Sequence, residues 1–180
     1  MKTNIVLIGF MGTGKTAVGK RLAALLNKEF YDTDQEVEAV TGMSIAQLYS
    51  RYGEVRFRSE EKLAVNRLAQ RADCVIATGG SVALERYNID LLSEKGVLVC
   101  LSARPDIIYE RVRRRNNRPI LQKGDLYETI LKLMAQREFI YKCADFYIDT
   151  SDMEFQDIIN SIMDFLKELE QPSFNLQENQ

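Results

Sequence analysis

Short apolar runs alternate along this chain with longer segments in which apolar residues recur at helical spacing. Three runs have the length of buried strands: Asn4–Gly9, Cys74–Gly80 and Val97–Ser102. Two shorter runs, Phe30–Asp34 and Asp145–Thr150, are predicted as further strands. Because most of these runs are continuously apolar, both faces of the strands are expected to be buried, as in a parallel sheet.

The segments between the predicted strands have the periodicity of helices. The predicted helices span Lys15–Asn27, Gln35–Val40, Ser44–Tyr52, Glu54–Arg71, Pro105–Arg114, Leu126–Cys143 and Phe155–Leu169, with a short helical hairpin before Val97. Strand and helix therefore alternate five times, without an internal repeat or a low-complexity linker. This pattern predicts a single α/β domain with a parallel sheet.

The composition narrows the setting in which the protein works. Of 180 residues, 46% are hydrophobic, which is enough for a core, and the net charge of −2 gives no overall field that attracts nucleic acid or membranes. No apolar run reaches the roughly 18–20 residues needed to cross a bilayer. The first run continues into a glycine loop rather than a signal-peptide cleavage site. Three widely spaced cysteines match no metal or disulfide pattern, so a cytoplasmic protein is expected.

The chain contains no histidine. This absence removes the commonest general base and the commonest ligand of transition metals. Any catalysis must therefore use carboxylates, lysine, arginine, backbone amides or a hard cation.

The stretch Gly9–Thr16, GFMGTGKT, fits the phosphate-loop pattern G-x-x-x-x-G-K-[ST]. Its glycines let successive N–H groups point into one concavity, and the following helix adds its positive N-terminal end. Lys15 is expected to reach the β- and γ-phosphates, and the Thr16 hydroxyl to ligate Mg²⁺. Because the loop lies between a predicted strand and a predicted helix, nucleoside triphosphate binding is favoured over a glycine-rich turn that binds nothing.

A phosphate loop narrows the class of protein without fixing the reaction, because switches, motors and small-molecule kinases all carry one. A GTPase switch needs an Asn-Lys-x-Asp guanine reader, and the stretch 27–30 has phenylalanine at the fourth position. A motor or a large ATPase usually needs a longer chain. These observations disfavour a GTPase switch and a motor, and they leave the reaction open.

Asp32 and Asp34 stand two residues apart in the predicted strand Phe30–Asp34. In an extended chain their side chains would point the same way, about 6–7 Å apart, so solvent, a metal ion or a hydroxylic substrate is expected between them. Ligands of parallel α/β sheets bind at the carboxyl ends of the strands. One acid is therefore expected to hold Mg²⁺ and the other to accept a hydrogen bond from an alcohol. The alternative is that Asp34 only caps the next helix.

Several spaced motifs together resemble the shikimate kinase family. They are GFMGTGKT, YDTDQEVE followed by TGMSIAQLYSRYGEVRFRSEE, ATGGS, RVRRRNNRPIL and QREFIYKCADFYIDT, and they extend from Asn4 to about Leu166. Their order and spacing are more specific than the phosphate loop alone. The resemblance implies an α/β P-loop fold of the nucleoside-monophosphate-kinase type. Its five-stranded parallel sheet would have the order 2-3-1-4-5, with helices on both faces.

The resemblance also implies the organisation of the chain and its reaction. Residues 1–170 would form a single kinase domain, with substrate-binding helices at about 34–62 and a lid at about 112–125, followed by a disordered tail at 171–180. The family reaction transfers the γ-phosphoryl group of ATP to the 3-hydroxyl of shikimate, a step of aromatic amino acid biosynthesis. ATP and shikimate are thus the expected partners, Mg²⁺ the expected cofactor, and a monomer the expected state.

The nucleotide side of the site follows from the same resemblance. Arg118 would close onto the phosphates, Arg111 would stack on the adenine, and Asp32 would act on the magnesium side through water, beside Thr16. Phosphoryl transfer needs alignment and cations over the developing charge. The expected ATP-binding residues are Gly12, Thr13, Gly14, Lys15, Thr16, Ala17, Arg111 and Arg118.

On the acceptor side, Asp34 would bind the substrate hydroxyls and orient or deprotonate the attacking one. Arg58 and Arg137 match the family's clamp for the substrate carboxylate, for which the planar guanidinium fork is suited. Gly79 and Gly80 would let the backbone approach the ring closely. The expected catalytic residues are Lys15, Asp34 and Arg118.

Two features leave more than one interpretation. Tyr49 and Phe57 match apolar walls around the substrate ring, but ordinary core packing explains them nearly as well. The five arginines within Arg111–Arg118 could form a nucleic-acid patch, although the run has no interleaved aromatic residues. The resemblance instead makes them part of a lid that excludes water.

Two departures from the family pattern concern binding more than activity. Ser81 stands where a third glycine is usual, and no proline follows the last strand, so Met153 or Phe155 would complete the adenine pocket.

Two rival functions remain. One is a kinase of another small hydroxy acid such as gluconate, against which the carboxylate clamp argues. The other is a regulatory P-loop protein that hydrolyses ATP slowly, against which Asp34 and the lid arginines argue.

Overall fold

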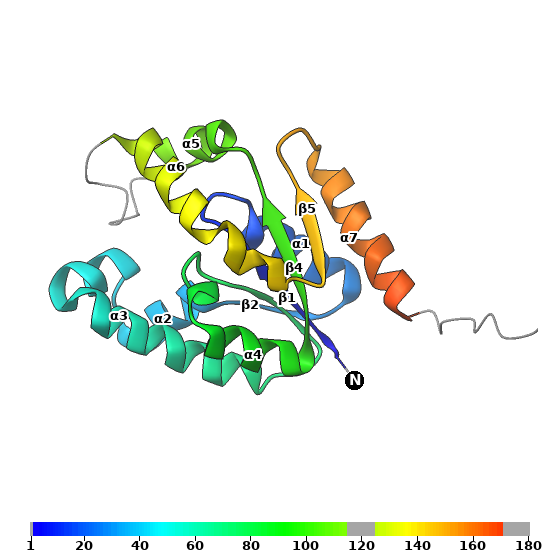
Figure 1. The fold of residues 1–180 in the computed structure, drawn as a ribbon. Helices are drawn as coiled ribbons and strands as arrows, with labels where there is room; N and C mark the ends of the chain where they lie inside the picture. The colour runs from blue at the N-terminus through cyan, green and yellow to red at the C-terminus, as the bar shows by residue number, and fades with distance from the viewer. Residues whose placement is uncertain (1, 115–124, 171–180) are drawn as a thin grey trace, which may run out of the picture.

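The computed structural model describes residues 2–114 and 125–170. Five parallel strands form one sheet in the order β2-β3-β1-β4-β5, as predicted (Figure 1). This order places β1, which leads into the phosphate loop, in the centre of the sheet. The strands are β1 (Asn4–Ile8), β2 (Glu29–Asp32), β3 (Cys74–Ala77), β4 (Gly96–Ser102) and β5 (Phe146–Asp149).

Helices cover both faces of the sheet, because successive strand residues point to opposite sides. Ile5 and Leu7 pack with helices α1 and α7, whereas Val6 and Ile8 pack with α3, α4, α5 and α6. The helices are α1 (Lys15–Leu26), α2 (Thr33–Thr41), α3 (Ile45–Ala69), η1 (Val82–Leu84), α4 (Arg86–Lys95), α5 (Pro105–Arg113), α6 (Leu126–Arg137), η3 (Glu138–Cys143) and α7 (Phe155–Glu170). The predicted fold class is confirmed.

The predicted strand Phe30–Asp34 is wrong at its end. Strand β2 stops at Asp32, and α2 begins at Thr33, two residues before the predicted start. The cause is local, since the Asp32 carboxylate accepts hydrogen bonds from the backbone N–H groups of Asp34 and Gln35, at 3.0 and 3.4 Å. The two acids therefore do not share one face of a strand, and Asp32, not Asp34, is the residue that caps the helix.

Three other predicted boundaries also change. The helices predicted on either side of Gly53 form one element, α3, broken where Gly53 has φ 79° and ψ 179°. The predicted helix Leu126–Cys143 ends as an α-helix at Arg137 and continues as the 3₁₀ helix η3. Strand β3 ends at Ala77, earlier than predicted. In the parts of the chain that the structure describes, no helix is both long and apolar enough to cross a membrane.

Candidate active site

The loop between β1 and α1 has the shape of an anion-binding cradle. Gly9, Gly12 and Gly14 have φ of 136°, 81° and 96°, a region that glycine adopts without strain. A Cβ added at Gly9 would overlap the carbonyl oxygen of Leu101. Helix α1 begins at Lys15, and no described side chain caps its first turn. Its first backbone N–H groups have no partner within the helix, which suits them to a phosphate.

Lys15 is folded into this loop. The residue is only 7% exposed, and its Nζ donates to the carbonyl oxygens of Gly9 and Phe10 at 2.8 and 2.7 Å. The Thr13 hydroxyl donates to the same Phe10 carbonyl at 2.8 Å. These bonds hold the loop from within and place the ammonium group inside the segment predicted to bind phosphate.

Thr16 and Asp32 are brought into direct contact. The Thr16 hydroxyl, in the first turn of α1, donates to Oδ2 of Asp32 at 2.8 Å. No group of three or more aspartate, glutamate, cysteine or histidine residues that could hold a metal occurs among residues 2–114 and 125–170. One hydroxyl and one carboxylate nevertheless fit Mg²⁺, which usually keeps several waters and takes its remaining oxygens from phosphates.

Asp34 lies against the turn that follows β3. A Cβ added at Gly79 would overlap Oδ1 of Asp34, so glycine is needed there for close approach. The Gly79 N–H also donates to the Thr33 hydroxyl at 2.7 Å, which ties the turn to the first residue of α2. The Asp34 carboxylate is therefore held at the carboxyl ends of β2 and β3, where ligands of such sheets bind.

Arg58 projects from α3 and is fixed by two acids. Its Nη1 lies 3.2 Å from Oε2 of Glu61, and its Nη2 lies 3.1 Å from Oε1 of Glu54. The side chain remains 22% exposed. The guanidinium is thus oriented by its own helix while part of it still faces solvent.

Arg137, the last residue of α6, is 6% exposed. Its Nη1 donates to the carbonyl oxygen of Gly80 at 3.2 Å, and its guanidinium carbon lies 5.5 Å from the centre of the Phe10 ring. This side chain therefore connects the glycine turn after β3 with the phosphate loop. The structure brings Arg137 and Asp34 directly to one turn, Gly79–Ser81, and links Arg58 to it through Glu61. The three side chains come from three separate helices.

Glu61 is a site residue that the sequence analysis missed. It is 1% exposed, accepts from the Ser81 hydroxyl at 2.5 Å through Oε1, and pairs with Arg58 through Oε2. Burial raises the pKa of its carboxyl above the usual range, although the Ser81 hydrogen bond and Arg58 act in the opposite direction. A usable signal existed, because Arg58 and Glu61 are three residues apart on a predicted helix, where opposite charges meet.

The arginine-rich segment is described only in part. The Arg111 guanidinium donates to the carbonyl oxygen of Gly12 at 3.3 Å, so α5 is attached to the phosphate loop. The stacking of Arg111 on adenine stays a prediction. Arg118, most of the predicted lid at 112–125 and the predicted tail at 171–180 lie outside the described residues.

The aromatic and apolar residues predicted around the ligands lie in different parts of the structure. Phe57 is 4% exposed and packs in a small core with Val37 and Leu48, as expected of ordinary packing. Tyr49 packs at the edge of that core, and its hydroxyl donates to Glu54 at 3.2 Å. Met153 packs beside α1 and α7, while Phe155 is 45% exposed at the start of α7. A role for either in an adenine pocket stays a prediction.

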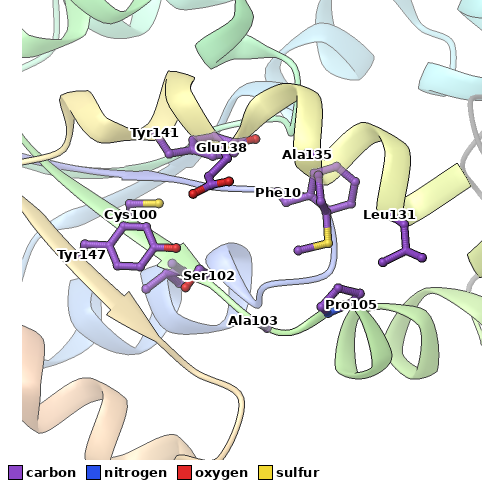
Figure 2. A pocket seen from close by; sticks show the side chains of 12 residues that line it. Phe10, Cys100, Ser102, Ala103, Pro105, Leu131, Ala135, Glu138, Tyr141 and Tyr147 are labelled. Carbon is purple, nitrogen blue, oxygen red and sulfur yellow. The ribbon is translucent and has the colours of Figure 1, made fainter. Parts of the chain in front are cut away.

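A cavity of about 320 Å³ lies between the end of β4 and helices α5 and α6 (Figure 2). Phe10, Pro105, Leu131, Ala135 and Tyr141 are among the residues that line it. None of the predicted ATP-, substrate- or metal-binding residues is part of this lining. The candidate site is therefore defined by the convergence of charged groups around the glycine turn. The cavity adjoins it through Phe10 and through Tyr141, whose hydroxyl donates to the Gly80 carbonyl at 3.5 Å.

Comparisons with known proteins point to one family. The sequence profile described as "Shikimate kinase" matches residues 11–167. A shikimate kinase of Pelotomaculum thermopropionicum is 52% identical over 165 residues, which cover 92% of this chain and 96% of that protein. The solved structure of a shikimate kinase from Acinetobacter baumannii in complex with shikimate superposes with a TM-score of 0.91 at 34% identity, covering 96% of this chain and 97% of that one.

A more distant structure shows how widely the fold extends. A gluconokinase from Sinorhizobium meliloti superposes with a TM-score of 0.62 and is 16% identical, over 94% of this chain and 95% of that one. At that identity the similarity concerns the fold alone. The fold by itself therefore does not decide between acceptors.

Proposed function

The chain belongs to the shikimate kinase family, and from that premise we propose how its residues carry the transfer of a phosphoryl group from ATP to shikimate. The observation that carries the proposal is the convergence of Asp34 and Arg137 on the turn Gly79–Ser81, beside the phosphate loop, with Arg58 linked to the same turn through Glu61. These groups are one acceptor for a hydroxyl and two cations for a carboxylate. They match a substrate that is both an alcohol and an acid.

On the nucleotide side, the loop N–H groups and Lys15 bind the β- and γ-phosphates and stabilise the charge that develops during transfer. Thr16 and Asp32, already joined by a hydrogen bond, would hold Mg²⁺. When bound, this ion supplies neutralisation of charge on the phosphate oxygens. Gly12, Thr13, Gly14 and Ala17 contribute backbone to the cradle, while Arg111 and Arg118 add cations from beyond it.

On the acceptor side, the substrate carboxylate pairs with Arg58 and Arg137, which fixes the ring in one orientation. Asp34 accepts a hydrogen bond from the 3-hydroxyl and removes its proton as the oxygen attacks the γ-phosphorus. The bond from that phosphorus to the β-γ bridging oxygen breaks, and ADP leaves. Gly79 and Gly80 leave room for the ring beside Asp34. Holding the alcohol in line with the phosphate accounts for much of the rate gain in such reactions.

The test is an assay of ADP formation with Mg²⁺ and ATP, in which shikimate, quinate, gluconate and nucleoside monophosphates are compared as acceptors. We expect shikimate to be preferred clearly over all the others. Equal or better turnover with gluconate would favour the rival sugar-acid kinase. Rapid ADP release without any alcohol would favour the rival regulatory protein that hydrolyses ATP.

We also infer that residues 1–170 act as one kinase domain and that the enzyme is a cytoplasmic monomer that binds neither nucleic acid nor membranes. The net charge of −2 supports the last point, because affinity for nucleic acid and anionic lipid depends on a positive surface. Light scattering coupled to size-exclusion chromatography would measure the mass in solution. A dimer at micromolar concentration would contradict the monomer.

A further inference from the structure

Ser81 occupies the third position of the turn after β3 and is 7% exposed. Its Oγ donates to Oε1 of Glu61 at 2.5 Å, and Oε2 of the same carboxylate lies 3.2 Å from Nη1 of Arg58. One buried carboxylate therefore joins the turn to the guanidinium that is proposed to bind the substrate acid. Glycine, the residue usual at this position, has no side-chain donor to offer.

Both arginines of the proposed clamp are linked to this short turn by hydrogen bonds. Arg137 reaches it directly, through the carbonyl oxygen of Gly80 at 3.2 Å. Arg58 reaches it indirectly, through Glu61 and the Ser81 hydroxyl. The turn thus sets the position of one guanidinium by its backbone and of the other by its side chain, so the spacing between the two cations depends on both bonds.

We propose that Ser81 is a positioning residue for acceptor binding, because its hydroxyl holds the Glu61 carboxylate in the orientation in which it aims Arg58 at the substrate carboxylate. This inference rests on the proposed function above. Without the hydroxyl, the buried Oε1 of Glu61 loses its donor, and such an oxygen is costly to leave unpaired. The carboxylate then turns or takes up a proton, and its hold on Arg58 weakens.

The charges around Glu61 show why the hydroxyl matters. Burial and the nearby Asp34 carboxylate raise the pKa of Glu61, while Ser81 and Arg58 lower it. Gly79 shows how close the two carboxylates are. A Cβ added there would overlap Oδ1 of Asp34 and would lie 3.5 Å from Oε1 of Glu61. Removing the Ser81 hydroxyl removes one of the groups that favour the charged carboxylate. As the pH is lowered, the affinity of the variant for the substrate should therefore begin to fall at a higher pH than that of the wild type.

The experiment compares Ser81→Ala and Ser81→Gly with the wild-type enzyme, by calorimetric titration with shikimate and by steady-state kinetics between about pH 5 and pH 8. We expect the Kd and KM for shikimate to rise about three- to thirtyfold, as for a hydrogen bond to a charged group that acts through a second residue. The KM for ATP should stay within about twofold and kcat within about threefold. The pH below which shikimate binding weakens should rise in both variants. Ser81→Thr, which keeps a hydroxyl, should return this pH to the wild-type value.

The matched control is Ser59→Ala, which removes an exposed hydroxyl from α3 whose Oγ donates only to the backbone carbonyl of Val55 among the bonds described. It should leave all constants unchanged. An unaltered shikimate Kd and pH profile in both Ser81→Gly and Ser81→Ala would overturn the inference, and so would an equal rise in the KM for ATP. The backbone of Ser81 has φ −108° and ψ −14°, which alanine and glycine both adopt, so we expect both variants to fold. If the wild-type enzyme neither bound nor phosphorylated shikimate, the proposed function itself would fail.

Discussion

The phosphate loop is assembled from neighbours in the sequence, whereas the acceptor side is assembled from distant segments. Lys15 donates to the carbonyls of Gly9 and Phe10, six and five residues earlier. Asp34, by contrast, meets the turn at Gly79, and Arg137 bonds to Gly80, 57 residues away. The bonds that hold Lys15 in the loop therefore lie within one short stretch, to which α5 adds Arg111 at the Gly12 carbonyl. The acceptor side exists only once the sheet and three helices have packed.

The two regions also differ in how their cations are held. The hydrogen bonds of Lys15 to Gly9 and Phe10 end on neutral carbonyl oxygens, so these two bonds orient the ammonium without neutralising it. Arg58 is held by two carboxylates, Glu54 and Glu61, one of them buried. Lys15 is the one charged residue of the stretch Gly9–Thr16, while the acceptor side shares its task among several charged groups. Substitutions should accordingly have a larger effect in the loop than on the acceptor side.

The sharpest test of this difference is Lys15→Ala. Loss of the ammonium removes charge stabilisation from the transferring phosphate, and we expect kcat to fall about 10³-fold, at the upper end for one preorganised donor. ADP formation at saturating shikimate measures this. Lys20→Ala, which removes an exposed lysine from the same helix, is the control and should retain full activity. A fall of less than tenfold in Lys15→Ala would break the comparison.

Asp34→Asn should have the next largest effect. The amide keeps the shape of the side chain but cannot take a proton, and general-base catalysis contributes about 10²–10⁴-fold. We expect kcat to fall about 10²-fold while the KM for shikimate changes little. Asp90→Asn, which alters an exposed ion pair with Arg86, is the control. Nearly normal kcat in Asp34→Asn would mean that the residue orients the hydroxyl without accepting its proton.

Arg58→Leu should act mainly on substrate binding. One arm of the carboxylate clamp is lost, so we expect the KM for shikimate to rise about tenfold to a hundredfold, as for a hydrogen bond between charged groups. The KM for ATP should be unchanged. Arg51→Leu removes an exposed arginine from the same helix and should affect neither constant. An unchanged shikimate KM in Arg58→Leu would show that the clamp assignment is wrong.

Glu61→Gln should produce the smallest effect, and it should appear in stability. Burial raises the pKa of Glu61 in the folded protein, so its charged form opposes folding above that pKa. At neutral pH the neutral variant should therefore unfold at a higher temperature than the wild type, while it binds shikimate more weakly. The gain should disappear as the pH falls below the usual glutamate pKa of about 4.3, where both forms are neutral.

Thermal unfolding at neutral pH and near pH 4 measures this difference. Glu60→Gln is the matched control, because it alters the adjacent carboxylate and its ion pair with the exposed Arg56. It should give no stability gain. If Glu61→Gln were less stable than the wild type at neutral pH, the acceptor side would be held together by its charges, and its contrast with the phosphate loop would need revision.

Much of the fold could be predicted because its signals are local. The five strands are recognisable as apolar runs, and the phosphate loop is a contiguous motif. The predicted end of β2 was wrong because one hydrogen-bonding side chain, Asp32, caps a helix within a stretch that otherwise has strand character. Apart from the pair Asp32 and Asp34, the acceptor residues were available only through resemblance. Glu61 was missed because its bond to Ser81 joins segments 20 residues apart.

The sequence by itself determined the alternation of strands and helices, the phosphate loop and the absence of histidine chemistry. These properties depend on residue types and on spacings of a few residues. Only the tertiary structure decided that Asp34 would lie against Gly79, that Arg58 would be held through Glu61, and that Arg137 would reach Gly80. The physical reason is that such contacts need the parallel sheet to bring its strand ends together, and no short stretch of sequence records that distance.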